Sequence, residues 1–325
     1  VHPLTPGVIL TLDIEALSIR FEEQLRQVAV ADSPFVTEAA SHLIAAGGKR
    51  FRPQLVYLAS GFGGEVDEEQ LLKAALVMEL THVASLYHDD VMDEADVRRS
   101  APSANSRWGN SIAILIGDYL FAKASILVAD LGTDYVRLQA ETFTRLVQGQ
   151  IAETRGPGTG EAPLEHYLQV IADKTGSLIA ASALFGAMIA GAPQSIREAL
   201  VAYGEEIGLV FQLSDDIIDI TSDVTGKTPG TDLREGVPTL PTLLLEASRD
   251  PADQPLKDLL AGDLSDDAAL AEALAVLRAH PVVEKARAEV CRHADLARQH
   301  LAPLPEGDAK QLLLQVCDDL VKRST

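Results

Sequence analysis

Cysteine and aromatic residues are scarce in this chain of 325 residues. It contains two cysteines, one tryptophan and 5% aromatic residues, whereas alanine and leucine are abundant. This composition favours helices over a β-sandwich. Cys291 and Cys317 lack metal-ligand spacing, so we expect reduced thiols of a cytoplasmic protein, with a single disulfide as the alternative.

Basic residues are also few. The chain has 27 Lys and Arg against 48 Asp and Glu, which gives a formal net charge of −21. Such a charge argues against a nucleic-acid surface and against a polybasic anchor on an anionic membrane. The places where basic residues do cluster are therefore informative.

A secretory signal and a membrane anchor are not expected either. The first ten residues lack a basic segment followed by a long apolar core. The longest apolar runs are 112–129, which Asp118 and Lys123 interrupt, and 177–192, which is short and rich in small residues. We expect both runs to be buried helices of a bundle.

The order of apolar and breaking residues predicts one all-α domain over residues 1–325. Helical periodicity covers 12–30, 34–46, 111–131, 133–153, 164–189 and 195–219, and we expect Pro53 to open a further helix. No segment alternates as a strand does, and no repeat of 20–50 residues is found. A domain boundary near residue 250 is the alternative.

An Asp-Asp-x-x-Asp cluster lies in an apolar helical segment, at Asp89, Asp90 and Asp93. Residues four apart share one face of a helix, so Asp89 and Asp93 should point the same way and repel each other. Mg2+ would relieve this repulsion, and it binds through one or two carboxylates plus substrate phosphates. A solvated acidic face is the alternative for one such cluster alone.

The same spacing returns in a second apolar segment, at Asp215, Asp216 and Asp219. Carboxylates on buried helices need a compensating charge. Facing each other across a helical bundle, the two clusters would form a cation-filled site for an anionic ligand.

Further motifs make the chain resemble the trans-polyprenyl diphosphate synthases, the family of farnesyl and geranylgeranyl diphosphate synthases. The motifs occur in order as Gly47 to Pro53, the first aspartate cluster with Arg98-Arg99, Lys174-Thr175, Gln212 with the second cluster, and Gly226-Lys227. Together they are far more specific than one aspartate cluster. The resemblance implies a class I isoprenoid synthase fold, in which long helices surround a central cavity. It also implies head-to-tail condensation of isopentenyl diphosphate with an allylic diphosphate.

The resemblance assigns roles to the charged motifs. Mg2+, three ions with bound diphosphate, would be held by Asp89 and Asp93 on one side and Asp215 on the other, with Asp90, Asp216 and Asp219 acting through water or orienting the others. The residues that would bind isopentenyl diphosphate are Lys49, Arg52, His82 and Arg99. Arg98 would bind the allylic diphosphate. A core histidine is the alternative for His82, a pair of solvated cations for Lys49 and Arg52, and surface salt bridges for Arg98 and Arg99.

The remaining motif residues would surround the reacting centre. The resemblance places Lys174, Thr175 and Gln212 beside the allylic diphosphate and the nascent cation, and Lys227 in a lid that excludes water. Where many members have a second lysine this sequence has Val237, and Arg234 is the candidate substitute for its charge. No side chain resembles a general base, and the family assigns proton removal to the released diphosphate.

Small residues precede the first aspartate cluster, at Thr81, Ala84 and Ser85. Short-chain family members have bulky aromatic residues four and five positions before the first aspartate, so about two turns of 5.4 Å each should be open here. We therefore predict an all-trans product of C30 or longer, with geranylgeranyl diphosphate as the second choice. The alternative is that these small residues only allow close helix packing.

Two other classes of protein share parts of this pattern. A class I terpene cyclase needs no isopentenyl site, and Lys49, Arg52 and the second aspartate cluster argue against it. A non-catalytic subunit of a heteromeric synthase tends to lose aspartates, and both clusters are complete here. The resemblance implies a homodimer.

Overall fold

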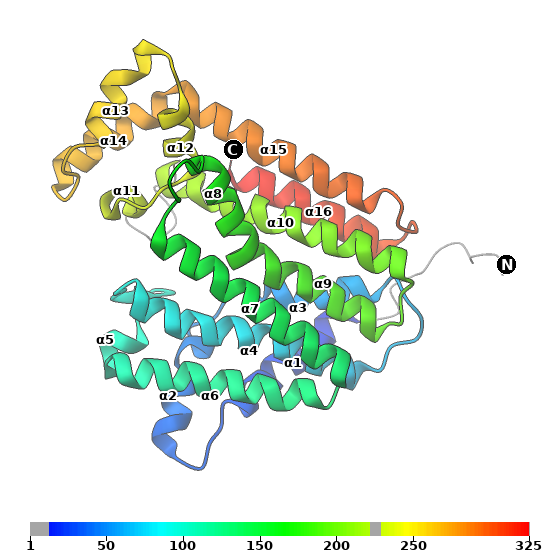
Figure 1. Ribbon diagram of the computed structural model, residues 1–325. Coiled ribbons are helices and arrows are strands. Elements are labelled where there is room, and N and C mark those ends of the chain that lie inside the picture. The colour runs from blue at the N-terminus through cyan, green and yellow to red at the C-terminus, as the bar shows by residue number, and fades with distance from the viewer. Residues whose placement is uncertain (1–12, 222–228, 325) are drawn as a thin grey trace. The chain divides into compact units, whose positions relative to one another are not determined.

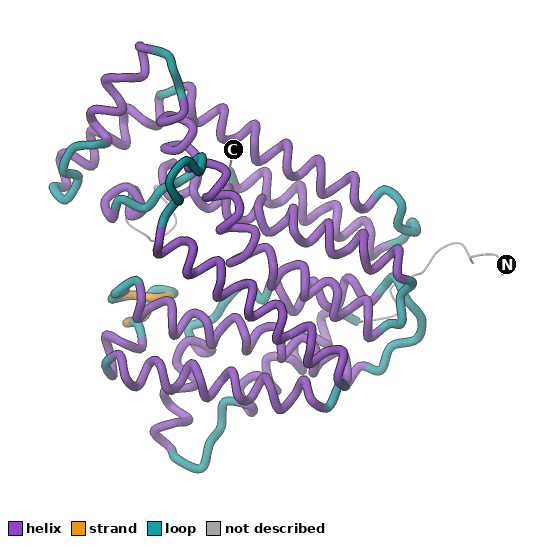
Figure 2. The backbone as a smooth tube through the Cα atoms, viewed as in Figure 1, coloured by secondary structure: helices purple, strands orange, loops and turns teal. Residues whose placement is uncertain are grey.

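The described chain is almost entirely helical, which confirms the predicted all-α fold. The computed structural model describes residues 13–221 and 229–324. Figure 2 shows helices throughout, with one short pair of strands. The elements before residue 130 are α1 (Ile14–Val28), α2 (Pro34–Ala45), α3 (Phe51–Ser60), α4 (Glu68–Met92), β1 (Val97–Arg98), β2 (Ala101–Pro102), α5 (Ala104–Trp108) and α6 (Asn110–Ala129). The later elements are α7 (Thr133–Arg155), α8 (Pro163–Ile171), the π-helical turn η1 (Ala172–Gly176), α9 (Ser177–Ile189), α10 (Gln194–Thr221), α11 (Thr231–Glu235), α12 (Leu240–Ala247), the 3-10 turn η2 (Pro251–Asp253), α13 (Gln254–Leu260), α14 (Asp267–Ala279), α15 (Pro281–Leu301) and α16 (Asp308–Arg323).

The chain divides into two compact units, and neither is continuous in sequence. The first takes the residues up to Thr144, Leu178–Gly204 and Pro303–Leu313. The second takes Arg145–Ser177, Glu205–Ala302 and the residues from Leu314 onward. No division falls near residue 250, because Glu205–Ala302 belongs to one unit.

In the first unit, α4 and α6 run side by side (Figure 1). A glycine permits their close approach, since a Cβ atom at Gly117 would lie 2.3 Å from Nε2 of His88. Helix α4 begins after Asp67, whose side chain accepts hydrogen bonds from the first free N–H groups of the helix. The Tyr87 hydroxyl donates to the Ala39 carbonyl at 2.5 Å and ties α4 to α2.

In the second unit, side-chain hydrogen bonds join the last part of α10 to α15 and α16. The Ser214 hydroxyl donates to the Leu320 carbonyl over 3.2 Å. The His293 ring lies 2.6 Å from the Glu206 carboxylate. These contacts fix the part of α10 that carries the second aspartate cluster.

Three local features differ from the sequence-based expectation. Helix α3 begins at Phe51, so Pro53 lies within its first turn, where its missing N–H costs nothing. The predicted helix over 164–189 is interrupted by the π-helical turn Ala172–Gly176. The hairpin of β1 and β2 was not predicted, because strands of two residues are too short to alternate.

The apolar runs have different environments. By length and composition two described stretches could cross a membrane, Asn110–Ala129 and Pro163–Ile189, and their most apolar windows are 33% and 72% buried. The expectation of a buried helix is therefore wrong for much of α6, where Leu115 and Ile126 are 60% and 65% exposed. Helical periodicity brings them to one face because they lie three turns apart.

Candidate functional site

The first aspartate cluster lies at the C-terminal end of α4. Asp93 is the capping residue, and its N–H donates to the Asp89 carbonyl at 2.8 Å, so the two carboxylates are one helical turn apart. Asp90 is fully buried and pairs with Nε of Arg98 at 2.5 Å. Burial raises the pKa of Asp90, and the Arg98 charge opposes that shift. Its second oxygen, Oδ2, has no hydrogen-bond partner among the described residues.

The hairpin places Arg98 and Arg99 beside the end of α2. The Arg99 guanidinium donates to the Leu43 carbonyl at 2.9 Å and also to the Gly47 carbonyl. A Cβ atom at Gly48 would lie 3.0 Å from the guanidinium nitrogens of both Arg50 and Arg99. Glycine at this position therefore lets two arginines approach the same turn.

Several cations surround one neutral histidine in the first unit. Burial lowers the pKa of His82 well below its ordinary value, and the charges of Arg52, Arg99 and Arg98 lower it further. Burial also lowers the pKa of Arg52 to about 10, and the Nε of Arg52 has no partner among the described residues. The structure thus brings Arg52, His82, Arg98 and Arg99 together, whereas Lys49 is exposed before α3. Concentrated positive charge with an unsatisfied donor suits an anion.

The second aspartate cluster has one buried member. Asp216 accepts hydrogen bonds from the Tyr167 hydroxyl, from the Leu240 N–H at 2.8 Å and from Nε2 of Gln212 at 3.3 Å. Burial raises the pKa of Asp216 to about 7, and the three donors oppose the shift.

The other two members of the second cluster have different partners. Asp215 pairs with Arg323 near the end of α16. Oδ2 of Asp219 accepts from the Asp232 N–H at 3.3 Å, and the Asp219 carbonyl accepts from the Gly230 N–H at 2.9 Å. Asp219 therefore anchors the start of α11.

A cavity of about 400 Å3 in the second unit brings predicted catalytic residues together. Lys174, Thr175 and Gln212 all line it, and Nζ of Lys174 pairs with the Glu153 carboxylate at 2.5 Å. The acidic residues of its wall are Glu153, Asp216, Asp232 and Glu246. The predicted lid residue Lys227 lies outside the described residues.

A π-helical turn sets the position of Lys174 and Thr175. A Cβ atom at Gly208 of α10 would lie 2.4 Å from the Cα atom of Gly176, so the two backbones are in contact there. Nε of Arg145 pairs with Asp173 at 2.6 Å, and its Nη2 donates to the Ala172 carbonyl at 3.2 Å. π-helical turns are rare and often occur at functional sites.

Val237 lines the same cavity, at the position where many family members have a lysine. The proposed substitute, Arg234, pairs with Asp267 of α14 at 2.5 Å. This partner lies on a different helix and is exposed, and the role of Arg234 as a replacement stays a prediction.

The small residues of α4 are all buried. The Thr81 hydroxyl accepts from Nε2 of Gln139 at 3.2 Å, and the Ser85 hydroxyl donates to the His82 carbonyl at 2.8 Å. The backbone of Ala84 lies beside α6, because a Cβ atom at Gly117 would lie 3.1 Å from the Ala84 carbonyl oxygen. The open product pocket stays a prediction.

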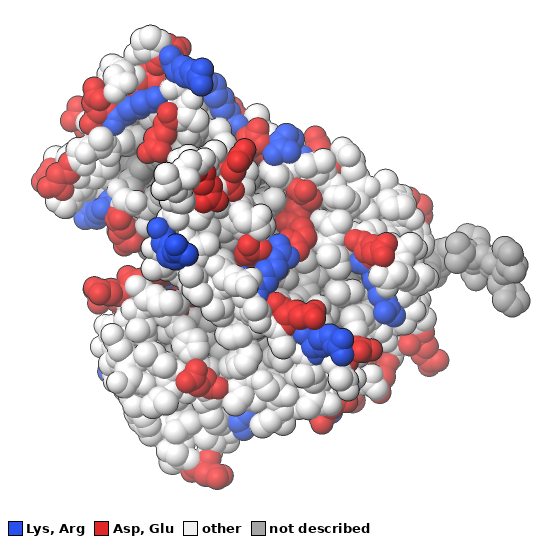
Figure 3. Space-filling view, viewed as in Figure 1, with Lys and Arg blue, Asp and Glu red and all other residues white. Residues whose placement is uncertain are grey.

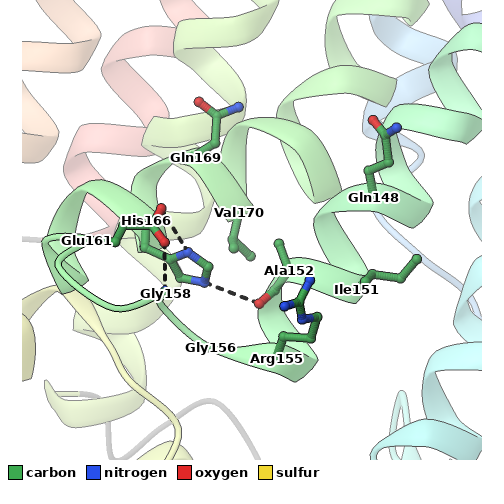
Figure 4. Close-up of a pocket in the computed structure, with 10 residues that line it drawn as sticks. All are labelled: Gln148, Ile151, Ala152, Arg155, Gly156, Gly158, Glu161, His166, Gln169 and Val170. Carbon is green, nitrogen blue, oxygen red and sulfur yellow. Dashed lines mark hydrogen bonds and ion pairs between the residues drawn. The ribbon is translucent and has the colours of Figure 1, made fainter.

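A second, more open pocket of about 390 Å3 lies beside the end of α7 (Figure 4). His166 stands at its edge, with Nε2 3.2 Å from the Ala152 carbonyl and Nδ1 3.3 Å from the Glu161 carboxylate. Glu161 also accepts from the Gly158 N–H at 2.8 Å. None of the predicted site residues lines this pocket.

Some residues of the site were missed by sequence reasoning. Tyr167 lies seven residues before Lys174, and this helical spacing could have placed the two on the same face. Glu153 carried no motif signal of its own. Arg323 reaches Asp215 from the far end of the chain, and that contact depends on tertiary structure alone.

Comparison with known proteins gives one consistent result. A family model described as Polyprenyl synthetase matches residues 33–277. A nonaprenyl diphosphate synthase of Mycobacterium tuberculosis is 46% identical over 93% of this chain and 91% of its own length. Component 2 of the heptaprenyl diphosphate synthase of Geobacillus stearothermophilus is 37% identical over 93% of this chain and 94% of its own. The structure of a geranylgeranyl pyrophosphate synthase from Corynebacterium glutamicum, complexed with calcium and isoprenyl diphosphate, has a TM-score of 0.86 and 46% identity over 97% of both chains.

Proposed function

This chain belongs to the polyprenyl synthetase family, and on that premise we propose that it joins isopentenyl diphosphate head-to-tail to an allylic diphosphate. It is a prenyltransferase, and its product is an all-trans polyprenyl diphosphate of C30 or longer. The observation that carries the proposal is the cavity in which Lys174, Thr175 and Gln212 lie with the buried Asp216. Residues from α8, the π-helical turn, α10 and the segment before α12 meet there.

The side chains of this cavity suit a reaction that develops positive charge. Lys174 would bind the allylic diphosphate as a donor, and Thr175 and Gln212 offer a neutral hydroxyl and a neutral amide. Such groups stabilise a cation without forming a covalent bond to it. The carboxylates of the wall add negative potential on the same side.

The arginine cluster of the first unit suits the diphosphate groups. Arg52 and Arg99 would bind isopentenyl diphosphate together with Lys49, and Arg98 would bind the allylic diphosphate. Neutral His82 can contact the isopentenyl group without adding charge. Because no general base is needed in this scheme, the proton lost in the last step goes to the released diphosphate.

The carboxylates fit Mg2+, and we propose Asp89, Asp93 and Asp215 as its protein ligands, with Asp90 and Asp219 acting through water or by orienting the others. No group of three or more His, Cys, Asp or Glu residues that could hold a metal occurs in the described parts of the chain. Mg2+ typically binds through one or two carboxylates and completes its shell with water and substrate phosphates. Bound Mg2+, three ions in our proposal, would neutralise the charge of the leaving diphosphate. The calcium bound by the Corynebacterium glutamicum synthase supports oxygen ligation of a divalent ion.

The product length follows from Thr81, Ala84 and Ser85, none of which can block a pocket with an aromatic ring. The relatives differ, since one is a nonaprenyl diphosphate synthase and another a geranylgeranyl pyrophosphate synthase, each 46% identical to this chain. Geranylgeranyl diphosphate is therefore the second candidate.

We also propose a single functional domain over residues 1–325, a cytoplasmic location and a homodimer. The apolar face of α6 supports self-association. The component 2 relative favours one alternative, a heteromeric synthase in which this chain needs a partner. Activity of the purified chain alone distinguishes the two assemblies.

The decisive experiment is mass spectrometry of the products formed from isopentenyl diphosphate with each allylic primer and Mg2+. We expect a polyprenyl diphosphate of C30 or longer, no product after chelation, and recovery when Mg2+ is restored. A farnesyl product alone would contradict the product length. Absence of any condensation by the chain alone would contradict the homomeric enzyme.

A further inference from the structure

We propose that His42 is a positioning residue for Arg98 and Arg99. The inference rests on the proposed function, in which these two arginines bind diphosphate groups. His42 lies in the last turn of α2 and has no place in the motifs by which the chain resembles its family. Its contacts lie within the first unit.

The hairpin that carries the two arginines has a strained turn. Its register pairs Arg98 with Ala101, so Arg99 and Ser100 form the two-residue turn. Both have positive φ, 52° and 61°. A two-residue hairpin turn of this kind normally has Asn or Gly, because a bulky residue in this conformation is strained. Such a turn persists only where its surroundings hold it.

The surroundings hold the first strand and the turn through the arginines themselves. Arg98 pairs with the buried Asp90, and Arg99 donates to the Leu43 carbonyl. Below the strands, the Ser103 hydroxyl donates to the Ala95 carbonyl at 2.5 Å. When a diphosphate binds the arginines, their contacts to the protein must compete with it. Contacts that do not use the arginines then become more important for the turn.

His42 supplies such a contact to the second strand. Its Nε2 lies 2.7 Å from the carbonyl oxygen of Pro102. A carbonyl can only accept, so Nε2 carries the hydrogen. His42 directly precedes Leu43, and the last turn of α2 therefore holds the second strand through a side chain and the turn of the hairpin through a backbone carbonyl.

A neighbouring cluster fixes the tautomer and orientation of His42. Nδ1 of His42 lies 3.4 Å from Nη1 of Arg107, which can only donate, so Nδ1 accepts. The ring packs edge-on against Trp108 with centroids 5.0 Å apart. Arg107 in turn lies 4.3 Å above the Trp108 ring and pairs with Glu38 of α2. The imidazole is thus held on both sides with its donor aimed at Pro102.

Two substitutions separate the hydrogen bond from the packing. His42→Phe keeps the ring against Trp108 and removes the donor, whereas His42→Gln keeps a donor amide and loses the ring. We expect His42→Phe to raise KM for the diphosphate substrates about 3- to 10-fold, the effect of one lost hydrogen bond, with kcat changed less than about 2-fold. The KM of His42→Gln should be close to that of the wild type. The matched control, His300→Phe on α15, should leave both constants unchanged.

Hydrogen exchange of the amides between Val97 and Ser103 provides a readout that does not depend on activity. We expect faster exchange in His42→Phe than in the wild type, and near wild-type exchange in His42→Gln. Unchanged KM together with unchanged exchange in a folded His42→Phe protein would overturn the proposal, as would equal effects of Phe and Gln. If His42→Phe does not fold, Arg107→Gln tests the same network, with an effect in the same direction expected.

The two hypotheses fail in different ways. A wild-type chain that makes no product would contradict the proposed function, and the exchange measurement would still decide whether His42 holds the hairpin. An active wild type, together with unchanged KM and unchanged hydrogen exchange of the hairpin in His42→Phe, would contradict only the positioning role.

Discussion

At the scale of single residues, burial and neighbouring charge decide which groups are ionised. His82 is neutral because it is buried among arginines, and Asp216 has a raised pKa because it is buried. Asp90 is also buried, but it forms an ion pair with Arg98, whose charge opposes the rise of its pKa. Residues of one type therefore have different roles, and their environments rather than their identities distinguish them.

The lowered pKa of His82 predicts a pH-dependent stability. Below about pH 6.5 the unfolded chain binds a proton at this residue that the folded chain does not bind, so stability is lost as the pH falls through that value. Between pH 6.5 and 5.5 we expect His82 to lower the free energy of unfolding of the wild type by at most about 1.4 kcal/mol per pH unit, and His82→Gln to lack this contribution. Urea unfolding of both proteins at pH 7.5, 6.5 and 5.5 measures it. A difference between them that stays constant over this range would contradict a neutral His82, and His300→Gln is the matched control.

The small side chain at Ala84 leads to a prediction about the length of the product. Ala84→Phe should shorten the product if this side chain lines the pocket, because a ring would fill the turn below the diphosphate. Product analysis by mass spectrometry measures the change. The Ala84 side chain is buried, and overpacking costs about 1–3 kcal/mol, so the melting temperature must be measured in parallel. A folded, active variant with an unchanged product would remove Ala84 from the pocket wall.

At the scale of elements, close backbone contacts position the functional segments. The π-helical turn that carries Lys174 lies directly against α10 at Gly208, and α6 lies against α4 at Gly117. At Gly208 a Cβ atom would overlap backbone atoms, whereas at Gly117 it would overlap the His88 ring and lie 3.1 Å from the Ala84 carbonyl oxygen.

We expect Gly208→Ala to displace the π-helical turn. The added Cβ would lie 2.4 Å from the Cα atom of Gly176, which is backbone and cannot rotate away. The variant should lose about 1–3 kcal/mol of stability, and its kcat should fall because Lys174 and Thr175 move. Gly64→Ala is the control, since its Cβ would meet nothing closer than 3.8 Å. Urea unfolding and steady-state kinetics test both variants, and an unaffected Gly208→Ala would show that the turn can shift freely.

At the scale of the whole molecule, α6 provides a surface suited to a second copy of the chain. Its exposed large side chains are Ile114, Leu115 and Ile126. Few charged side chains lie on the surface over α6 (Figure 3). Single exposed apolar residues are common on proteins, and the exposed Asp118 lies between Leu115 and Ile126, so we propose α6 as an interface on the strength of three apolar side chains on one helix.

Charge on this face should disturb assembly. We expect the wild type to sediment as a dimer in analytical ultracentrifugation, and Leu115→Glu with Ile126→Glu to shift it to monomer, because two buried unpaired carboxylates are costly. Ile19→Glu, at a residue 58% exposed on α1, is the control. A monomeric wild type, or a dimer that tolerates both glutamates, would exclude this face.

Much of the fold and of the family assignment could be predicted from the sequence. The apolar periodicity and the positions of proline and glycine predicted most helices within a few residues, because these signals are local. The ordered motifs predicted the polyprenyl synthetase family, which the comparisons confirm. The roles of individual site residues stay predictions.

Residue order alone determined the helical class, the two aspartate clusters and the chemistry that their spacing suits, because helical periodicity is written in neighbouring residues. Tertiary structure alone decided that Asp90 turns inward to Arg98, that Tyr167 joins Asp216, that Lys174 lies in a π-helical turn and that α6 stays partly exposed. These features depend on contacts between residues far apart in the chain, and no local pattern encodes which partner a buried charge will find.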